Sequence, residues 1–406
     1  MKHDYDVVVV GGGPCGSFSA LQAAKKGVSV AVFEEHREVG IPVHCPGHIS
    51  IKGLRQIGLY PLPNKVIENV FYGARFYSPK GVEFSIRFHS PVTCTVNREF
   101  FDKYLKKLAE NFGTQYYLKS RVKSVITAEN SRVKGVKVQY NSKDAEVYSK
   151  MVIDAEGISA RLTREAGLKL PRETRLLKAV HAEIENVKDI EDDAVEVYLG
   201  NAYAPGFYCW IIPKKDGKAK VGLAVREGDP RDFLKKLMLK HPEASLKLKK
   251  SKIVYKHFHS ISLGGPIPKT FSNGFLVVGD AASQVKPTTG GGIIIGLNCA
   301  KIAAEVAVEA LNKGDISENY LSQYQKRVSK LMGFDMKTML IIRKIMDRMA
   351  DKKIDSIAHF YEKMRMNEAV KNIKEIDFQG KAMINAIKDP RILAFLTYSF
   401  ITCILP

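Results

Sequence analysis

Three glycines near the N-terminus have the spacing of a phosphate-binding turn. Residues 5–36, YDVVVVGGGPCGSFSALQAAKKGVSVAVFEEH, pass from an apolar run through Gly11, Gly13 and Gly16 to a second apolar run that ends at Glu34. In a dinucleotide-binding unit these glycines permit a tight turn, close approach of a pyrophosphate, and packing of the helix on the strand. An acidic residue about 20 positions later holds ribose hydroxyls. We therefore predict a dinucleotide site at this turn.

A second glycine-rich junction lies within residues 273–307. Asp280 ends an apolar strand there, where its carboxylate can hydrogen-bond a ribityl hydroxyl. Gly290, Gly291 and Gly292 then open a helix of small residues, and helix N-termini favour negative charge. Reduced flavin develops negative charge at one edge of its ring, so a flavin is the predicted ligand. A second phosphate loop and an ordinary strand–helix junction are the alternatives.

Large apolar side chains gather in PGFYCWIIPKK, residues 205–215, which holds the only tryptophan of the chain. On a β-strand, successive side chains point to opposite faces. The two expected faces carry Tyr208, Trp210 and Ile212 on one side and Phe207, Cys209 and Ile211 on the other. One face can pack on a core while the other lines an apolar cavity, or both faces can be core.

Helices and strands must hold these side chains in place. Arg98 stands just before an expected helix, and Asp154 to Gly157 follow an expected strand. Residues 70–90, VFYGARFYSPKGVEFSIRFHS, alternate like two strands around an SPKG turn. AVEVYLG and AKVGLAVR have the same character, and residues 326–406 show the apolar periodicity of helices.

We accordingly expect a mixed α/β protein with a discontinuous Rossmann-like FAD-binding domain, an antiparallel-sheet substrate domain and a C-terminal helical domain. The expected boundaries are 1–70, 92–175 and 268–325 for the FAD-binding domain, 71–91 and 176–267 for the sheet domain, and 326–406 for the helical domain.

Composition restricts the partners. The 406 residues carry a formal net charge of +20, which attracts an anionic membrane, an acidic protein or nucleic acid. The lysines are dispersed and accompany no nucleic-acid motif, so nucleic acid is not expected. The terminal run ILAFLTYSFITCILP is shorter than the ~20 apolar residues that span a bilayer. This terminal run is therefore expected to form a packed helix or to make a shallow contact with a membrane surface.

The six cysteines argue against zinc ribbons and iron–sulfur clusters because none of them forms a CxxC pair. No signal peptide precedes the first strand. We therefore expect a cytoplasmic protein with reduced thiols.

Taken together, four motifs resemble the FAD-dependent oxidoreductases of the p-hydroxybenzoate hydroxylase type. The motifs are GxGxxG with Glu34, Arg98 before a helix, DAEG, and GDAAS followed by PTTGGGI. Over roughly residues 1–330, the chain is most similar within this group to the archaeal geranylgeranyl reductases. HCPGH carries part of this narrower likeness through Cys45 and its glycine loop.

The rest of the narrower likeness lies in YCWIIP, which is similar to that family's YxWxFP at Tyr208, Trp210 and Pro213. Ile212 replaces the family's Phe, and GLA at 222–224 replaces its GxG. In DAEG, Glu156 replaces the usual second Asp of the wider group.

The resemblance implies which residues form the site. The implied FAD-binding residues are Gly11, Gly13, Cys15, Gly16, Glu34, Cys45, Gly47, Arg98, Val122, Asp280, Gly290, Gly291, Gly292 and Ile293. The implied catalytic residues are Cys45, Tyr208 and Trp210. The Cys45 thiol could tune the flavin or relay a proton, or it could be a small buried residue. His44 and His48 beside it form no recognised metal-ligand spacing, so no metal is expected.

The resemblance further implies a reductase that saturates C=C bonds of geranylgeranyl chains on isoprenoid membrane lipids or prenyl diphosphates. Reduced flavin would supply hydride, an acid would supply the proton, and aromatic faces would ease positive charge on carbon. The chain has no second GxGxxG unit, which favours a docking electron donor such as reduced ferredoxin over NAD(P)H. We expect a monomer associated peripherally with the membrane.

Two other functions remain open at this point. One is a flavin-dependent monooxygenase acting on an aromatic or polyprenyl substrate, which would consume O2. The other is a basic membrane- or nucleic-acid-binding protein in which FAD is only structural.

Overall fold

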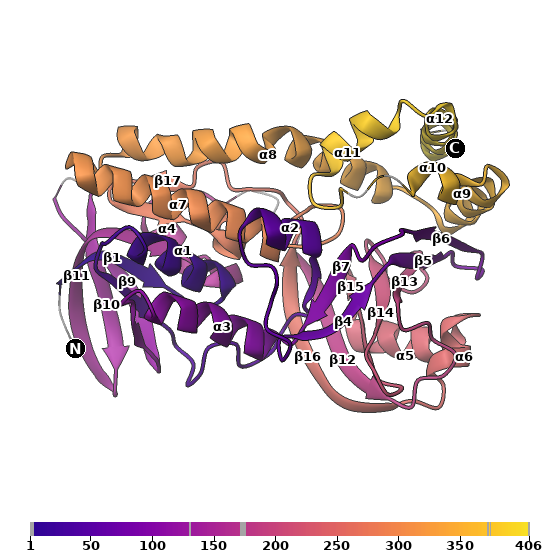
Figure 1. The fold of residues 1–406 in the computed structure, drawn as a ribbon, viewed down its shortest axis with the longest axis horizontal. Coiled ribbons are helices and arrows are strands. Elements are labelled where there is room, and N and C mark those ends of the chain that lie inside the picture. The colour runs from indigo at the N-terminus through magenta and orange to yellow at the C-terminus, as the bar shows by residue number, and fades with distance from the viewer. Residues whose placement is uncertain (1–3, 130, 171–175, 372, 374, 405–406) are drawn as a thin grey trace. The chain divides into compact units, whose positions relative to one another are not determined.

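The fold comes from a computed structural model that describes residues 4–129, 131–170, 176–371, 373 and 375–404 (Figure 1). The chain divides into two compact units, each assembled from three segments of sequence. The first unit comprises residues 1–43, 98–174 and 262–334, and the second comprises 44–97, 175–261 and 335–406. The three-domain division expected from the sequence stays a prediction.

A mainly parallel sheet forms the centre of the first unit. Its strands are β1 (Asp4–Val10), β2 (Val30–Phe33), β8 (Gln115–Tyr117), β9 (Ser120–Thr127), β10 (Val133–Tyr140), β11 (Lys143–Asp154), β17 (Phe271–Ser272) and β18 (Phe275–Val277). β1 pairs in parallel with β2 and β11, and β11 pairs in parallel with β18. β9, β10 and β11 are joined antiparallel. Residues 7–10 are buried on both faces, as expected for a central parallel strand.

Helices cover this sheet. They are α1 (Pro14–Ala24), α3 (Arg98–Glu110), α4 (Arg161–Glu165), α7 (Ile293–Lys313) and the short turns η1 (Gly157–Ser159) and η2 (Gly279–Ala282). α1 packs against α7, α3 and β1, as Figure 1 shows. Small buried residues such as Ser19 in α1 and Ala300 in α7 permit the close approach of these two helices.

A seven-stranded sheet forms the centre of the second unit. Its order is β16 (Lys252–Ser262), β12 (Leu176–Glu185), β15 (Ala219–Val225), β14 (Tyr208–Pro213), β13 (Ala194–Leu199), β5 (Gly73–Tyr77) and β6 (Glu83–Arg87). The two strands predicted around SPKG are β5 and β6, and they pair antiparallel as expected. β13 and β5 pair in parallel, which differs from the expected antiparallel sheet. A connection of more than 100 residues separates these two strands, and only such long connections allow parallel neighbours.

Smaller elements complete the second unit. A three-stranded sheet consists of β3 (His48–Ser50), β7 (Thr93–Val96) and β4 (Ile67–Phe71), with α2 (Ile51–Gln56) after β3. α5 (Pro230–Lys240) and α6 (Ala244–Leu248) pack on the large sheet.

The C-terminal region is helical, as its periodicity predicts. It contains α8 (Glu318–Met346), α9 (Asp351–Lys363), α10 (Met366–Val370), α11 (Gln379–Ala386) and α12 (Pro390–Ile404). Among the described residues, no helix combines the length and the apolarity that crossing a membrane requires.

Candidate functional site

The turn between β1 and α1 has the geometry that its glycines predict. Gly11 has φ +93° and donates its N–H to the Phe33 carbonyl at 2.8 Å. A Cβ on Gly16 would overlap the Gly11 carbonyl, so only glycine allows α1 to start this close to the turn. A Cβ on Gly13 would meet no atom of the described residues within 4 Å, which leaves open space in front of the helix N-terminus. A phosphate group fits such a place.

Glu34 lies beside this turn at the end of β2. Its nearly buried carboxylate accepts hydrogen bonds from the Gly12 N–H at 2.7 Å and from the His36 N–H at 2.9 Å. His36 Nδ1 lies 2.6 Å from the same carboxylate. The carboxylate is thus held where a ribose of a bound dinucleotide is expected, while the contact with His36 was not foreseen.

Val122 lies in β9, next to the segment that carries Glu34. The Ser120 N–H donates to the Glu34 carbonyl at 2.8 Å, which joins the start of β9 to the end of β2. Val122 is buried, and its carbonyl accepts a hydrogen bond from Arg161 at 2.6 Å. The role of Val122 in binding FAD stays a prediction.

Cys15, the second residue of α1, lies against two glycines from distant parts of the sequence. A Cβ on Gly279 would lie 2.8 Å from the Cys15 Sγ, and a Cβ on Gly296 would lie 2.5 Å from it. Burial raises the pKa of the Cys15 thiol well above its usual range. Cys15 therefore packs between α1, η2 and α7 with a neutral thiol, and its role in binding FAD stays a prediction.

Arg98 begins α3, rather than preceding it, and pairs with Asp102 one turn later. Its Nε and Nη2 lie 3.0 and 2.9 Å from the two Asp102 oxygens. Burial raises the pKa of Asp102, and the Arg98 charge opposes that rise. The Arg98 charge also opposes the elevated pKa values of Asp280 and Cys15, so the three predicted residues lie close together in the first unit.

Asp280 follows β18 and sits at the glycine-rich loop as predicted. It is exposed to solvent, but the protein atoms around it desolvate the carboxyl and raise its pKa. A Cβ on Gly292 would lie 3.2 Å from Asp280 Oδ1. Gly290 has φ +69°, which forms the turn that leads to Ile293, the first residue of α7. The N-terminus of this long helix is therefore next to Asp280, as the sequence predicts, and its positive end favours an anionic group.

The predicted Cys45 loop belongs to the second unit. The Gly47 N–H lies 3.4 Å from the Cys45 Sγ, and the Gly47 carbonyl accepts the Val96 N–H at 2.9 Å. His48 hydrogen-bonds Thr93 at 2.7 Å. The ring of His44 instead makes an edge-to-face contact with the ring of His257. In the described part of the chain, no cluster of three or more His, Cys, Asp or Glu could hold a metal ion.

The two faces of β14 differ as the alternation predicts. Cys209 and Ile211 belong to the hydrophobic core of the second unit. Trp210 lies opposite Gly222 of β15, and a Cβ there would lie 2.7 Å from the indole Cε2. The indole therefore occupies the space that a side chain at position 222 would take.

Phe207 departs from the expected alternation. Its ring stacks on Tyr208 with 4.2 Å between centroids, although the two were expected on opposite faces. Phe207 precedes β14 in a turn closed by its N–H to the Ala204 carbonyl, and side-chain alternation holds only within a strand. Tyr208 in turn contacts Trp210 edge to face at 6.0 Å, so the three rings form one continuous aromatic surface.

His181 was missed by the sequence analysis. It lies opposite Gly222 on the other flank, in β12, and therefore shares a sheet face with Trp210. Its side chain is fully buried, and among the described residues its two ring nitrogens and the indole Nε1 of Trp210 have no hydrogen-bond partner. Burial, reinforced by the charge of Lys220, lowers the pKa of His181 well below its usual value. The sequence signal that could have indicated this residue is a single histidine within the largely apolar strand LLKAVHAEIE.

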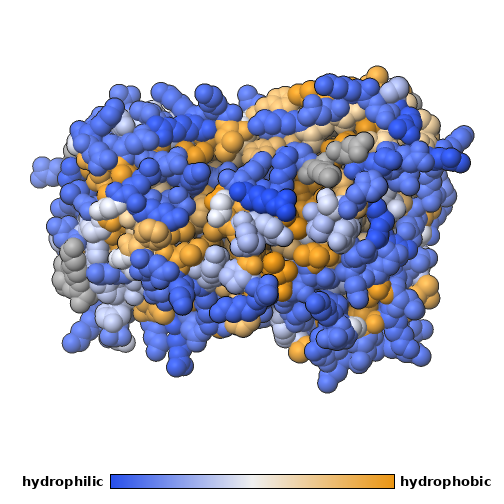
Figure 2. Space-filling model, in the orientation of Figure 1, coloured by the Kyte–Doolittle hydropathy of each residue, from blue (hydrophilic) through white to orange (hydrophobic). Residues whose placement is uncertain are grey.

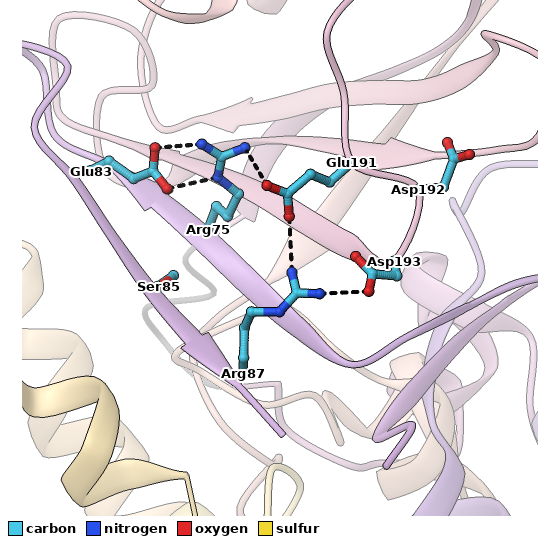
Figure 3. Close-up of a pocket in the computed structure, with 7 residues that line it drawn as sticks. All are labelled: Arg75, Glu83, Ser85, Arg87, Glu191, Asp192 and Asp193. Carbon is cyan, nitrogen blue, oxygen red and sulfur yellow. Dashed lines mark hydrogen bonds and ion pairs between the residues drawn. The ribbon is translucent and has the colours of Figure 1, made fainter. Parts of the chain in front are cut away.

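A cleft in the second unit is lined by charged and polar side chains. It has a volume of about 540 Å³ and is lined by Arg75, Glu83, Ser85, Arg87, Glu191, Asp192 and Asp193 (Figure 3). Arg75 pairs with Glu83 and Glu191, and Arg87 pairs with Glu191 and Asp193. Charged side chains that pair with one another do not suit an uncharged prenyl chain.

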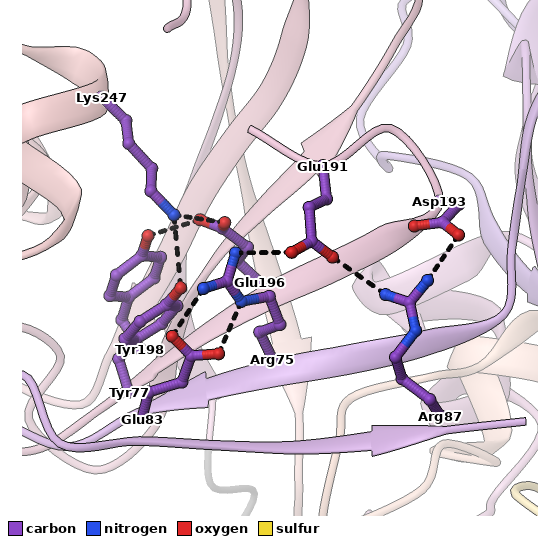
Figure 4. A network of polar contacts seen from close by, with 9 residues as sticks. All are labelled: Arg75, Tyr77, Glu83, Arg87, Glu191, Asp193, Glu196, Tyr198 and Lys247. Carbon is purple, nitrogen blue, oxygen red and sulfur yellow. Dashed lines mark hydrogen bonds and ion pairs between the residues drawn. The ribbon is translucent and has the colours of Figure 1, made fainter. Parts of the chain in front are cut away.

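A buried ion pair lies beside these cleft residues, and Figure 4 shows both groups together. Lys247 of α6 pairs with Glu196 of β13, and Tyr198 donates to Glu196 at 2.5 Å. Glu196 faces the sheet surface opposite to Trp210, because it pairs with Ile211. The network therefore ties α6 to the sheet and takes no part in the aromatic surface.

Comparison with known proteins agrees with this geometry. Residues 4–332 match the FAD binding domain family. The glycine turn, the held Glu34 carboxylate and the open space at Gly13 fit a bound FAD. The fold and the site thus define an FAD-dependent oxidoreductase.

More narrowly, the chain belongs to the digeranylgeranylglycerophospholipid reductase family. It is 36% identical to digeranylgeranylglycerophospholipid reductase 2 of Methanothermobacter thermautotrophicus, over 88% of this chain and 92% of the relative. It is 33% identical to digeranylgeranylglycerophospholipid reductase 1 of Methanococcoides burtonii, over 95% and 92%. A geranylgeranyl bacteriochlorophyll reductase-like structure from Thermoplasma acidophilum is 28% identical, covers 98% of this chain and 99% of its own, and has a TM-score of 0.86. The predicted family and cofactor are confirmed, while the individual site residues stay predictions.

Proposed function

We propose that this protein saturates C=C bonds of geranylgeranyl chains carried by isoprenoid glycerophospholipids or prenyl diphosphates. The names of its relatives support this substrate class. The observation that carries the proposal is the aromatic surface of β14, where Tyr208 and Trp210 turn away from the core formed by Cys209 and Ile211. A long polyprenyl chain needs such an apolar wall.

The residues of the chain would serve the reaction in distinct ways. When FAD is bound and reduced, it supplies the hydride for one alkene carbon. The faces of Tyr208 and Trp210 would ease positive charge that develops on the other carbon. Burial raises the pKa of Tyr208 well above its usual value, so its hydroxyl stays neutral near such charge. We assign the Cys45 loop to the same site, where its thiol would tune the flavin or relay a proton.

The test is anaerobic turnover of a digeranylgeranylglycerophospholipid by the holoenzyme with chemically reduced FAD. A reductase adds 2 mass units for each double bond, which mass spectrometry of the lipid detects. The monooxygenase alternative requires O2 and adds 16 mass units. Product that forms only with O2, or no saturated product at all, would overturn the proposal.

Trp210→Ala tests the aromatic wall. Losing a cation–π partner worth about 1–2 kcal/mol should slow alkene reduction about tenfold. FAD content should stay unchanged, since Trp210 lies outside the nucleotide motifs, and Trp210→Phe should keep more activity than Trp210→Ala. Equal loss of bound FAD and of activity would instead make Trp210 a residue of the structural core.

We further propose a monomer that associates peripherally with anionic membranes and receives electrons from reduced ferredoxin or NAD(P)H. The net charge of +20 supports attraction to both an anionic surface and an acidic protein. Electron transfer from each donor to the bound FAD can be followed by bleaching of the flavin absorbance.

A further inference from the structure

Lys220 is a buried cation inside an otherwise apolar strand. It lies in β15, AKVGLAV, and only 2% of the residue is exposed. Burial lowers the pKa of its ammonium group, and the nearby Glu68 opposes that shift. Because an unpaired buried charge is strongly destabilising, the contacts of this ammonium group indicate why a lysine stands here.

The three N–H donors of Lys220 meet three acceptors. Its Nζ donates to the Pro46 carbonyl at 2.9 Å, to the Val96 carbonyl at 3.4 Å, and to the Glu68 carboxylate. An ammonium group has three donors and no acceptor, so this set uses its full capacity. The position is therefore specific for lysine.

Two of these acceptors belong to the backbone around Cys45. Pro46 follows Cys45 directly, and the Val96 N–H donates to the carbonyl of Gly47. Lys220 thus joins the loop to β7 from one side while the Val96–Gly47 hydrogen bond joins them from the other. A single side chain spans 174 residues of sequence to hold this loop.

Lys220 also belongs to the aromatic face of the large sheet. It is two residues from Gly222, and its partner across β14 is Ile212, two residues from Trp210. Side chains two positions apart share a face, so Lys220, Gly222 and Trp210 face the same side. The ammonium group therefore links the Cys45 loop to the sheet surface that carries Trp210.

We propose that Lys220 is a positioning residue that holds the Cys45–Gly47 loop on the Trp210 face of the sheet. Any effect of Lys220 on catalysis rests on the proposed function, whereas its role in holding the loop does not depend on that function. Of its three acceptors, Pro46 belongs to the loop, Val96 belongs to β7 and is hydrogen-bonded to the loop, and Glu68 lies outside both.

Lys214 provides a matched control. It pairs with the same Glu68 at 3.0 Å and with Glu183 at 3.1 Å, and it is half-buried. Lys214→Met and Lys220→Met therefore both remove a cation from Glu68. Only the second removes contacts with the Cys45 loop.

The experiment measures alkylation of Cys45 by iodoacetamide in the folded holoenzyme, quantified by peptide mass spectrometry. Lys220→Met should raise the alkylation rate about tenfold, because losing charge-assisted hydrogen bonds of this kind frees the loop to open. Lys214→Met should change it less than about twofold, as expected for a more exposed pair. The FAD content serves as the reference and should not change.

Equal effects of the two variants on Cys45, or no effect of either, would overturn the positioning role. If Lys220→Met yields no folded protein, Lys220→Gln replaces it, since a neutral amide can still donate to a carbonyl. Faster Cys45 alkylation in Lys220→Gln than in Lys214→Met supports the proposal, and a rate at or below that of Lys214→Met overturns it. Because the thiol measurement needs no turnover, it stays valid if the wild type fails to reduce prenyl chains.

Discussion

Three glycines of the first turn differ in what surrounds them, although the motif treats them as one pattern. A side chain at Gly16 would overlap the backbone, and Gly11 has a left-handed φ of +93° that favours glycine. Gly13 has φ −65° and ψ −178°, which any residue adopts, and faces open space. Among the described residues, nothing around Gly13 requires a glycine, which agrees with the prediction that a bound pyrophosphate approaches the backbone there.

Gly13→Ala should therefore separate cofactor binding from folding. The melting temperature of the apoprotein should stay within a few degrees of the wild type, while FAD affinity should fall by about tenfold or more through a steric clash of about 1–3 kcal/mol. Flavin absorbance per chain and thermal denaturation measure the two effects. Normal FAD content in Gly13→Ala would show that the pyrophosphate lies elsewhere, and Gly16→Ala should impair both quantities.

A second prediction at this scale concerns Gly222, beneath the Trp210 indole. In Gly222→Ala the new methyl group would overlap the indole, with Cε2 at 2.7 Å, and would lie 2.5 Å from the Val180 carbonyl. Overpacking of this kind costs about 1–3 kcal/mol of unfolding free energy. Because Trp210 is the only tryptophan, its emission reports the displaced ring directly, and chemical denaturation gives the stability. An unchanged emission spectrum together with unchanged stability would contradict the packing described here.

At the scale of elements, the end of β11 shows how a strand terminus holds a titratable group. Asp154 is fully buried, where it accepts hydrogen bonds from the Glu156 N–H at 3.0 Å and from Thr163 Oγ1 at 2.7 Å. Burial, followed by the charge of Glu156, raises the pKa of Asp154 to about 7. The two hydrogen bonds oppose this rise, but burial and the Glu156 charge outweigh them.

The elevated pKa predicts how stability depends on pH. The folded protein binds a proton at Asp154 below about pH 7, whereas the unfolded chain releases it near pH 4. Stability from this group is therefore complete below about pH 4 and decreases up to about pH 7, by at most about 1.4 kcal/mol per pH unit. Asp154→Asn should flatten the urea-denaturation profile across this window. A profile that keeps its slope in the variant would assign the pH dependence to other groups.

At the scale of the whole molecule, the protein combines a high positive net charge with exposed apolar side chains near its C-terminus. The net charge is +20, and exposed apolar side chains lie on α11 and α12. They are Ile384 on α11, Leu393, Phe400 and Ile401 on α12, and Ile387 directly after α11. Figure 2 shows hydrophobic residues over this C-terminal region. A basic protein with such a patch suits the surface of an anionic bilayer.

Vesicle co-sedimentation across a salt series tests this association. Binding to anionic vesicles should exceed binding to neutral ones and weaken with salt, since each basic residue near the surface contributes roughly 1 kcal/mol and the Debye length is about 8 Å. A triple Leu393→Ser, Phe400→Ser, Ile401→Ser variant should lose the salt-resistant part. Equal binding to neutral and anionic vesicles at every salt concentration would contradict the electrostatic contribution, and an unaltered salt-resistant fraction in the triple variant would contradict that of α12.

Point substitutions are preferable to deletion of the last fifteen residues. Ile392 is buried with Tyr361 and Met366 in a core cluster of the C-terminal helices. Removing it would disturb the fold as well as the surface, so the effects of the two could not be separated.

The sequence by itself determined those features that are formed by residues close together in the chain. The unit from β1 to Glu34 is contiguous, so its spacing alone specifies a strand, a glycine turn, a helix and a carboxylate at the next strand end. The same holds for β14, where strand alternation separates Trp210 from Cys209. Alternation failed at Phe207 because the strand begins one residue later.

Only the tertiary structure decided which distant residues meet. Gly222 has no side chain because the register of β14 and β15 places the indole there, and His181 joins that face through the pairing of β12. Lys220 stands in β15 because two backbone carbonyls near Cys45 need a donor. Strand register and long-range contacts follow from the packing of the whole sheet, and no local pattern of residue types encodes them.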